Sequence, residues 1–190
     1  MSPRLDLLRH GETERGGGFR GSLDDELTAA GWARMEAALD GRGGWDALVC
    51  SPLRRCAAFA EALAGRLGLP LHVDADLREL HFGDWEGLDA ATVMARDAEA
   101  LGRFWADPFG CPPPGGEAVA DFAARVRAAR DRLVEAFPGR HLLVIGHAGA
   151  MRLLLAEARG LPAAELLQVQ VAHGALHRLR LDGDGRWREA

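Results

Sequence analysis

The chain has 190 residues, of which 48% are hydrophobic and 27% are charged, and its formal net charge is −5. A chain of this length can bury a core as one domain over residues 1–190, and its composition is that of an ordinary soluble globule. The acidic balance argues against a nucleic-acid-binding surface, and no apolar stretch approaches the ~18 residues of a membrane span.

Strands and helices are expected to alternate along the chain. Apolar runs predict strands at residues 4–9, 47–50, 71–73, 141–146, 167–171 and 175–181. Helical periodicity predicts helices at residues 28–39, 53–67, 89–106, 117–137 and 148–159, with Thr28 capping the first and Gly102 the expected place of any break in the third. This alternation predicts an α/β fold, a three-layer α/β/α sandwich with a mostly parallel central sheet. The last two strands follow each other closely, which predicts an antiparallel edge pair.

The first predicted strand ends in Arg9-His10-Gly11-Glu12-Thr13. A short apolar run that ends this way delivers two cationic side chains to its C-terminal tip, where open α/β sheets bind ligands. The guanidinium can bind a phosphate in a fork, and the imidazole can attack phosphorus. Taken alone, such an Arg-His pair is more often structural or incidental.

The apolar run 142–145 repeats this design, because it ends in Gly146-His147-Ala148-Gly149. Two strands of one parallel sheet would place His10 and His147 along the same edge. A core histidine is an equally good interpretation of His147 alone, and the repetition favours a site. A third predicted strand, at residues 47–50, also leads into a helix, and it places Arg54 and Arg55 near the helix N-terminus, which attracts anions. One of the two arginines could simply face solvent.

A loop at residues 77–87 mixes carboxylates, aromatic residues and glycines. Phosphoryl transfer from an alkoxide needs a proton donor, and a carboxylic acid near low-dielectric walls can serve. Glu79, Asp84 and Glu86 all qualify on chemistry alone, and nothing in the residues separates them.

Together these blocks resemble the histidine phosphatase superfamily, also called the phosphoglycerate mutase-like family, from residue 5 to about residue 181. The resemblance implies that His10 becomes phosphorylated and that Glu79, in a Leu-x-Glu pattern, is the proton donor. The Ser-x-Leu-x-Arg pattern selects Arg55 over Arg54, and His147 is the second histidine. The implied catalytic residues are His10, Glu79, Arg9, Arg55 and His147, and the expected substrate-binding residues are Arg9, Arg20, Gly21, Arg55, His147 and Ala148. No metal or other cofactor is expected, since protein cations would supply the charge.

Within the superfamily, the run 82–87 and the Pro-Gly-Gly-Glu segment at 114–117 resemble small bacterial phosphatases, notably alpha-ribazole phosphatase of cobalamin assembly. This implies a phosphomonoesterase that hydrolyses a small phosphorylated metabolite through a phosphohistidine. The alternatives are a phosphoglycerate mutase-type phosphoryl transfer, a phosphohistidine-protein phosphatase, and a phosphate-binding or interaction module without catalysis. The oligomeric state is left open.

Two positions near the motifs are ambiguous. Gly16 stands where the family often has asparagine, so a phosphate or substrate contact is missing unless Arg20 replaces it; a solvated loop arginine is an equally good interpretation. His173 and His177 have the i, i+4 spacing of a helical zinc site, but on the predicted strand they would lie roughly 13 Å apart. We therefore expect no metal there, and a surface histidine at His173, with the pocket mouth as the alternative.

The remaining expectations concern the cellular compartment of the protein. Cys50, Cys56 and Cys111 form an odd count without zinc spacing, and the N-terminus enters a strand without a signal peptide. We expect reduced thiols in a cytoplasmic protein that binds neither nucleic acid nor membrane.

Overall fold

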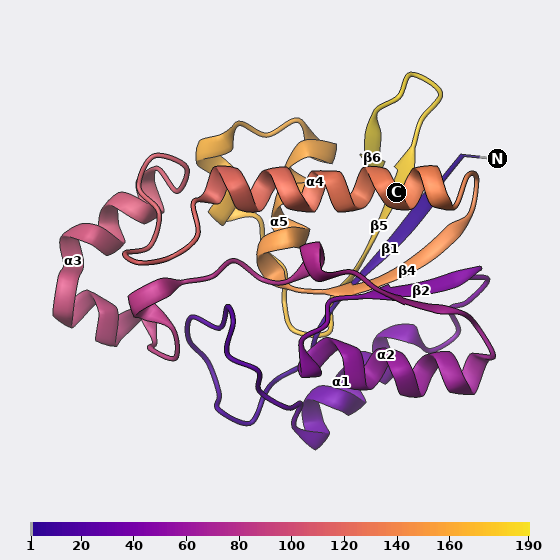
Figure 1. Cartoon of the computed structure of the whole chain (residues 1–190), viewed down its shortest axis with the longest axis horizontal. Helices are drawn as coiled ribbons and strands as arrows, with labels where there is room; N and C mark the ends of the chain where they lie inside the picture. The colour runs from indigo at the N-terminus through magenta and orange to yellow at the C-terminus, as the bar shows by residue number, and fades with distance from the viewer. Residues whose placement is uncertain (1) are drawn as a thin grey trace.

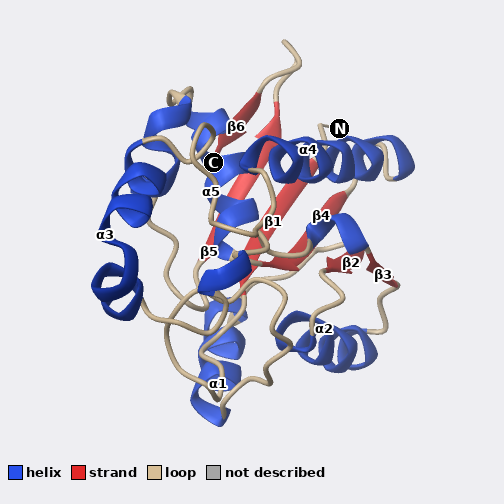
Figure 2. Cartoon of the chain, turned by 60° about the vertical axis from the view of Figure 1, so that its left-hand side comes forward, coloured by secondary structure: helices blue, strands red, loops and turns tan. Residues whose placement is uncertain are grey.

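The computed structural model describes residues 2–190 and is built on one six-stranded sheet (Figure 1). The strands are β1 (Arg4–Arg9), β2 (Ala47–Cys50), β3 (Leu71–Val73), β4 (His141–Gly146), β5 (Leu176–Leu181) and β6 (Trp187–Glu189). Their order is β3-β2-β4-β1-β5-β6 (Figure 2). The first four are parallel, and β5 and β6 are antiparallel additions beside β1.

Helices cover both faces of this sheet. They are α1 (Ala29–Leu39), α2 (Arg54–Leu67), α3 (Ala90–Ala106), α4 (Val119–Ala136) and α5 (Ala148–Arg159). Figure 1 shows α1 and α2 on one face and α4 and α5 on the other, with α3 standing beside the sheet. Successive strand residues point to opposite faces, so Leu7 joins the core under α4 and α5 while Leu8 joins the core under α1 and α2. The predicted three-layer sandwich is confirmed.

Local signals set most helix ends, with one exception inside α3. Thr28 caps α1 as predicted, because its Oγ1 accepts the N–H of Gly31 at 2.9 Å. The break in α3 was expected at Gly102 and lies at Asp97, where φ is −154°. The Asp97 carboxylate accepts the N–H of Ala100 at 2.9 Å and so caps a second half-helix.

The strand predicted at residues 167–171 is wrong. A short 3₁₀ helix, η3 (Ala163–Gln168), occupies its start. Beyond it, the carbonyl oxygens of Val169 and Val171 accept hydrogen bonds from Arg152 Nε at 3.0 Å and Arg9 Nη1 at 2.5 Å. Two arginine side chains thus bond to main-chain carbonyl oxygens that, in a strand, would accept hydrogen bonds from a neighbouring strand. An antiparallel edge pair does exist, but it joins β5 to β6, a three-residue strand that sequence patterning missed.

Asp6 is a carboxylate in the middle of the apolar strand β1, where it is only 3% exposed. Its Oδ2 accepts the indole N–H of Trp45 at 3.0 Å, and its Oδ1 lies 3.0 Å from Nε2 of His141. His141 opens β4, so this buried cluster joins the first and fourth strands at the edge opposite the strand tips.

The strand register places the histidines. Arg9 pairs with Gly146 across β1 and β4, and Cys50 pairs with Ile145 across β2 and β4. The residues that follow, His10 and His147, therefore leave neighbouring strands side by side at the C-terminal edge of the sheet.

Candidate active site

His10 lies at the centre of the C-terminal edge, with its ring centroid 5.3 Å from that of His147. Its Nδ1 is 2.7 Å from the carbonyl oxygen of Gly11. A carbonyl can only accept, so Nδ1 carries the hydrogen and Nε2 keeps its lone pair. Burial, reinforced by Arg55 and Arg9, holds the pKa of His10 well below its ordinary value. The ring is therefore a fixed, neutral imidazole, which is the form that can attack phosphorus.

His147 is fully buried beside His10. Arg55 Nε donates to its Nδ1 at 3.3 Å, so Nε2 carries the hydrogen and faces Ser51 Oγ at 2.7 Å. Burial and the neighbouring Arg55 hold the pKa of His147 well below its ordinary value. Its ring is thus a neutral donor within a hydrogen-bonded chain.

Arg9 has a buried donor without a partner. Its Nη1 and Nη2 contact Val171 O and His173 Nε2, at 2.5 and 2.9 Å. Its Nε is buried and has no hydrogen-bond partner among the described residues. An unmet buried donor costs about 1–3 kcal/mol, so this atom suits an oxyanion. Burial lowers the pKa of Arg9 to about 10, which leaves the guanidinium charged at neutral pH.

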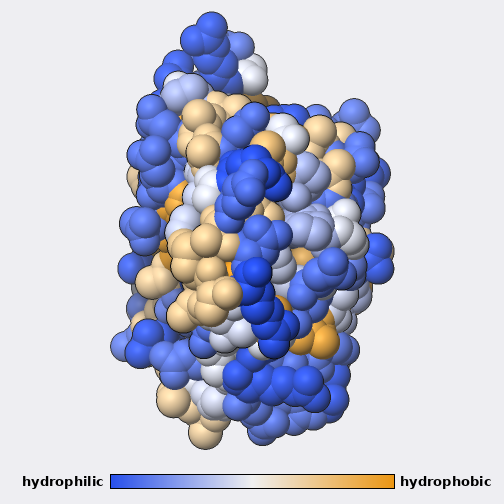
Figure 3. Space-filling model, turned by 90° about the vertical axis from the view of Figure 1, so that its left-hand side faces the viewer, coloured by the Kyte–Doolittle hydropathy of each residue, from blue (hydrophilic) through white to orange (hydrophobic). Residues whose placement is uncertain are grey.

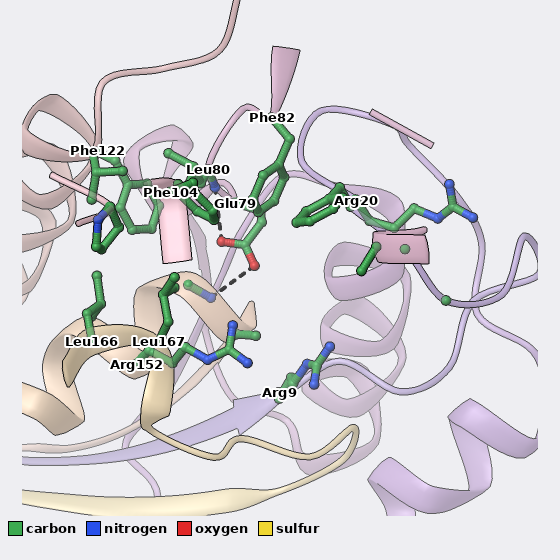
Figure 4. Close-up of a pocket in the computed structure, with 18 of the residues that line it drawn as sticks. Arg9, Arg20, Glu79, Leu80, Phe82, Phe104, Phe122, Arg152, Leu166 and Leu167 are labelled. Carbon is green, nitrogen blue, oxygen red and sulfur yellow. Dashed lines mark hydrogen bonds between the residues drawn. The ribbon is translucent and has the colours of Figure 1, made fainter. Parts of the chain in front are cut away.

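Two further buried atoms of the described residues, Arg20 Nε and Asp25 Oδ2, also lack a hydrogen bond of good geometry. They lie 3.2 Å from each other and form an ion pair. Figure 4 shows the Arg20 guanidinium turned away from Arg9. Both Gly16 and Arg20 line the pocket, and Arg20 as the replacement for the contact that Gly16 lacks stays a prediction.

The paired arginines Arg54 and Arg55 have different environments in the structure. Arg55 is fully buried, and it donates to the carbonyl oxygens of Leu23 at 2.6 Å, Gly21 at 2.9 Å and Arg20 at 3.1 Å. With the bond to His147, it holds the loop 20–23 against the sheet edge. Arg54 is exposed and pairs with Glu26.

Glu79 is the carboxylate at the pocket wall. Its Oε1 accepts the N–H of Leu80 at 2.9 Å, and its Oε2 accepts the N–H of Gly149, in the first turn of α5, at 3.0 Å (Figure 4). These two bonds fix the carboxyl group opposite Arg9.

The other two candidate acids lie outside this pocket. Glu86 accepts backbone N–H groups from Phe82 and from the loop residues Gly21, Ser22 and Leu23, at 2.9–3.3 Å. It therefore organises the loop that Arg55 holds from the other side. Asp84 is exposed to solvent.

The pocket has a volume of about 590 Å³. Five of the expected site residues line it: Arg9, His10, Arg20, Glu79 and Ala148. Arg55 and His147 are buried next to His10, and Gly21 lies in the pocket's supporting loop. The structure thus brings the expected residues into one region while giving them different access to it.

Two pocket residues were missed or misjudged. His173 was expected at the surface, but it lines the pocket with its ring 5.5 Å from that of His10. Burial, then Arg9, lowers its pKa to about 4, so its neutral Nε2 can accept from Arg9. The pair His173-Gly174 repeats His10-Gly11, and this was the signal that could have found it. The second missed residue is Arg152, which also lines the pocket and to which no motif in the sequence points.

No metal centre is evident among residues 2–190, where no three His, Cys, Asp or Glu side chains are grouped to hold an ion. His177 lies on β5 and pairs with Glu189, away from His173. Cys56 packs 3.6 Å from Nε2 of His147, and burial raises the pKa of its thiol, so it is no nucleophile at neutral pH. Over the same residues, no helix has both the length and the apolarity to cross a membrane.

Comparison with known proteins identifies the family of this chain. The sequence profile of the histidine phosphatase superfamily (branch 1) matches residues 5–189. A bifunctional protein of Mycobacterium tuberculosis is 40% identical over 184 residues, which cover 94% of this chain and 48% of that protein. The chain therefore spans about half the length of this relative. The adenosylcobalamin/alpha-ribazole phosphatase of Salmonella typhimurium is 32% identical, with 90% of this chain and 87% of that protein covered.

A solved structure with the same fold is that of a mycobacterial glucosyl-3-phosphoglycerate phosphatase. It superposes with a TM-score of 0.87 at 32% identity, and the match covers 100% of this chain and 97% of the other.

Proposed function

This chain belongs to branch 1 of the histidine phosphatase superfamily, and from that membership we propose that it is a phosphomonoesterase that hydrolyses a small phosphorylated metabolite through a phosphohistidine. The observation that carries the proposal is the neutral His10, anchored through Nδ1 to Gly11, beside the unpartnered buried Nε of Arg9. The first is a nucleophile and the second a donor for the group it attacks.

In the proposed first step, the Nε2 lone pair of His10 forms a bond to phosphorus while the bond from phosphorus to the ester oxygen breaks. Arg9, Arg55 and His147 stabilise the charge on the transferring phosphoryl oxygens. Arg9 and Arg55 bring positive charge, whereas neutral His147 has one N–H, which faces Ser51 Oγ in this structure and must turn from it to donate to the phosphoryl group. No metal ion is needed for this charge balance.

Glu79 acts on the other side of the phosphoryl group. In its protonated form it gives a proton to the leaving ester oxygen, which departs as the alcohol. The resulting carboxylate then takes a proton from water, whose oxygen attacks phosphorus and releases His10. Phosphate leaves, and Glu79 regains its proton. The position of Glu79 opposite Arg9 in the pocket supports this role.

For the substrate, we propose alpha-ribazole 5′-phosphate as the first compound to test, in the context of cobalamin biosynthesis. The run 82–87 and the similarity to an alpha-ribazole phosphatase support this choice. A glucosyl-3-phosphoglycerate phosphatase of Mycobacterium tuberculosis is 38% identical over 173 residues, so that compound belongs in the same panel. We further propose that residues 1–190 act as one domain.

The test is phosphate release from a panel of monoesters that contains both compounds and nitrophenyl phosphate. Rapid quenching should trap an acid-labile phosphoenzyme on His10, and His10→Ala should lose turnover and labelling while keeping its circular dichroism spectrum. Phosphate release only with a bisphosphate primer would indicate a mutase instead. Phosphate binding without release from any ester would indicate a binding module, and labelling elsewhere would refute the role of His10.

A further inference from the structure

The pocket has two chemically distinct ends. Its polar end holds Arg9, His10, Glu79 and His173, and three further polar side chains, those of Arg20, Arg152 and Gln168, also line the pocket. Its other end is lined by aromatic and aliphatic side chains, among them Phe19, Phe82, Phe104, Trp105, Leu166 and Leu167. These come from the loop after β1, from the loop 80–85, from α3 and from η3, so four separate segments converge on one apolar wall.

The aromatic part of this wall is packed in place. The ring of Phe19 lies 5.0 Å from that of Phe82 and 5.3 Å from that of Trp85, which in turn lies 5.5 Å from that of Phe104. Trp85 and Phe104 are buried, whereas Phe19 and Phe82 are half-buried where they face the pocket. The rings therefore form a preorganised surface that a ligand could cover without rearranging it.

The mechanism fixes which part of a substrate meets this wall. In-line attack by His10 sends the leaving oxygen toward Glu79, and the alcohol must continue beyond it. Figure 4 shows Phe82, Leu80 and Phe104 on the side of Glu79 that is remote from Arg9, with Leu166 and Leu167 across the pocket. The leaving alcohol would thus enter the apolar end.

The rim of this end is open to solvent. Trp105 lines the pocket and is 46% exposed, and Figure 3 shows the face that carries α3, where hydrophobic residues form a band among hydrophilic ones. An exposed aromatic side chain beside a concave apolar wall is typical of a binding site.

We propose that the leaving-group end of this site selects an apolar alcohol, so that the preferred substrates are amphiphilic monophosphates with one phosphate and a bulky hydrocarbon or aromatic body. This inference rests on the proposed phosphatase activity. A polyhydroxylated alcohol would lose its bonds to water along the aromatic and leucine side chains without gaining equivalent partners from them, and such unmet groups oppose binding. The polar side chains of Arg152 and Gln168 line the same pocket, so the alkyl series below tests which of the two kinds of contact dominates.

The test is a homologous series of ethyl, butyl and hexyl phosphate, whose leaving alcohols have nearly the same acidity. We expect kcat/KM to rise by about 2- to 4-fold per methylene until the apolar end is filled. Propyl phosphate should be a better substrate than glycerol 1-phosphate, its matched polar analogue. A flat or falling series, or a preference for glycerol 1-phosphate, overturns the inference while leaving the phosphatase proposal intact.

Variants localise the effect. Leu167→Asn and Trp105→Ala alter part-exposed wall residues and should flatten the series, because kcat/KM should fall more for hexyl phosphate than for ethyl phosphate. Met94→Ala is the matched control, because Met94 is an apolar residue of α3 that is 41% exposed and lies outside the pocket. A control that flattens the series as much as Leu167→Asn would contradict the assignment of the wall.

A binding measurement separates this inference from the proposed activity. Alkylphosphonates cannot be hydrolysed, and their affinity, measured by calorimetry, should rise with chain length. If no ester is hydrolysed but phosphonate affinity still rises, the phosphatase proposal fails and the apolar subsite stands. If phosphonate affinity does not depend on chain length, the proposed apolar subsite is rejected, whether or not the protein hydrolyses esters.

Discussion

Arg125 of α4 donates from Nη2 to the main-chain carbonyl oxygen of Glu79 at 3.0 Å. Its Nη1 donates to the carbonyl oxygens of Asp76 and Arg78 at 2.7 and 2.8 Å. Its Nε is held by Glu117 Oε1 at 2.7 Å. Glu117 belongs to the Pro-Gly-Gly-Glu segment, so this segment and α4 jointly fix the backbone that carries the proposed acid.

We predict that Arg125→Met displaces Glu79 and slows turnover of alkyl phosphates by about 10- to 100-fold, because a small misplacement of a reacting group has a large cost. Nitrophenyl phosphate, whose leaving group needs no proton, should lose much less. Arg125→Lys should rescue little, since one ammonium cannot reproduce the planar fork. The measurement is kcat for both substrates.

The control for Arg125 is Arg127→Met on the same helix, which removes a pair with Glu157 away from the pocket. It should leave the ratio of the two rates unchanged. Equal losses for both substrates in Arg125→Met would show that the clamp supports the fold and does not position the acid.

The second prediction is that Glu79→Gln lowers the rate for an alkyl phosphate by about 10²–10⁴, the usual loss of a general acid. The burst rate with nitrophenyl phosphate should fall less. Asp84→Asn, at an exposed site, should change little. Glu86→Gln should weaken four backbone hydrogen bonds and slow both substrates alike. A large leaving-group-dependent loss in Glu86→Gln, without one in Glu79→Gln, would reverse the assignment.

Third, activity should survive exhaustive chelation, because Arg9 and Arg55 supply the positive charge for the phosphoryl group. The assay compares phosphate release before and after dialysis against a chelator. A strict requirement for added divalent ions would contradict the assignment of this charge to Arg9 and Arg55.

Fourth, the free energy of unfolding should fall as pH drops below about 6.5. His10, His147 and His173 have lowered pKa values in the fold, so the unfolded chain binds their protons first. The stability of the fold with these three histidines neutral is fully present above pH 6.5. The part that belongs to His173 is lost as the pH falls from 6.5 to about 4. Thermal unfolding of His173→Asn should show a shallower pH slope there; an unchanged slope would contradict the burial argument.

The sequence predicts the parallel strands well because their signal is local. The bounds of β1, β2, β3 and β4 follow from short apolar runs, and the edge position of His10 and His147 follows from where those runs end. The interior of α3 and the segment after α5 escaped prediction for a different reason. Their backbone groups bond to side chains such as Asp97, Arg152 and Arg9, whose positions only the folded chain defines.

The candidate site divides in the same way. Strand ends identify Arg9, His10 and His147, but the residue types alone leave Glu79, Asp84 and Glu86 equivalent, because loop geometry decides which faces the pocket. His173 reaches His10 only because β5 returns antiparallel beside β1. The catalytic roles of these residues remain predictions for the experiments above.

The central position of β1 has a consequence for how the chain folds during synthesis. Its neighbours in the sheet, β4 and β5, lie in the last third of the chain, so the first strand to emerge waits unpaired. An unpaired apolar strand is prone to pair with other chains, and a charge within it opposes this. Asp6 supplies that charge in the nascent chain. Trp45, which donates to Asp6, is made early, whereas the other partner of Asp6, the half-buried His141, arrives on β4 itself. The carboxylate therefore gains its full set of contacts when the correct neighbouring strand docks.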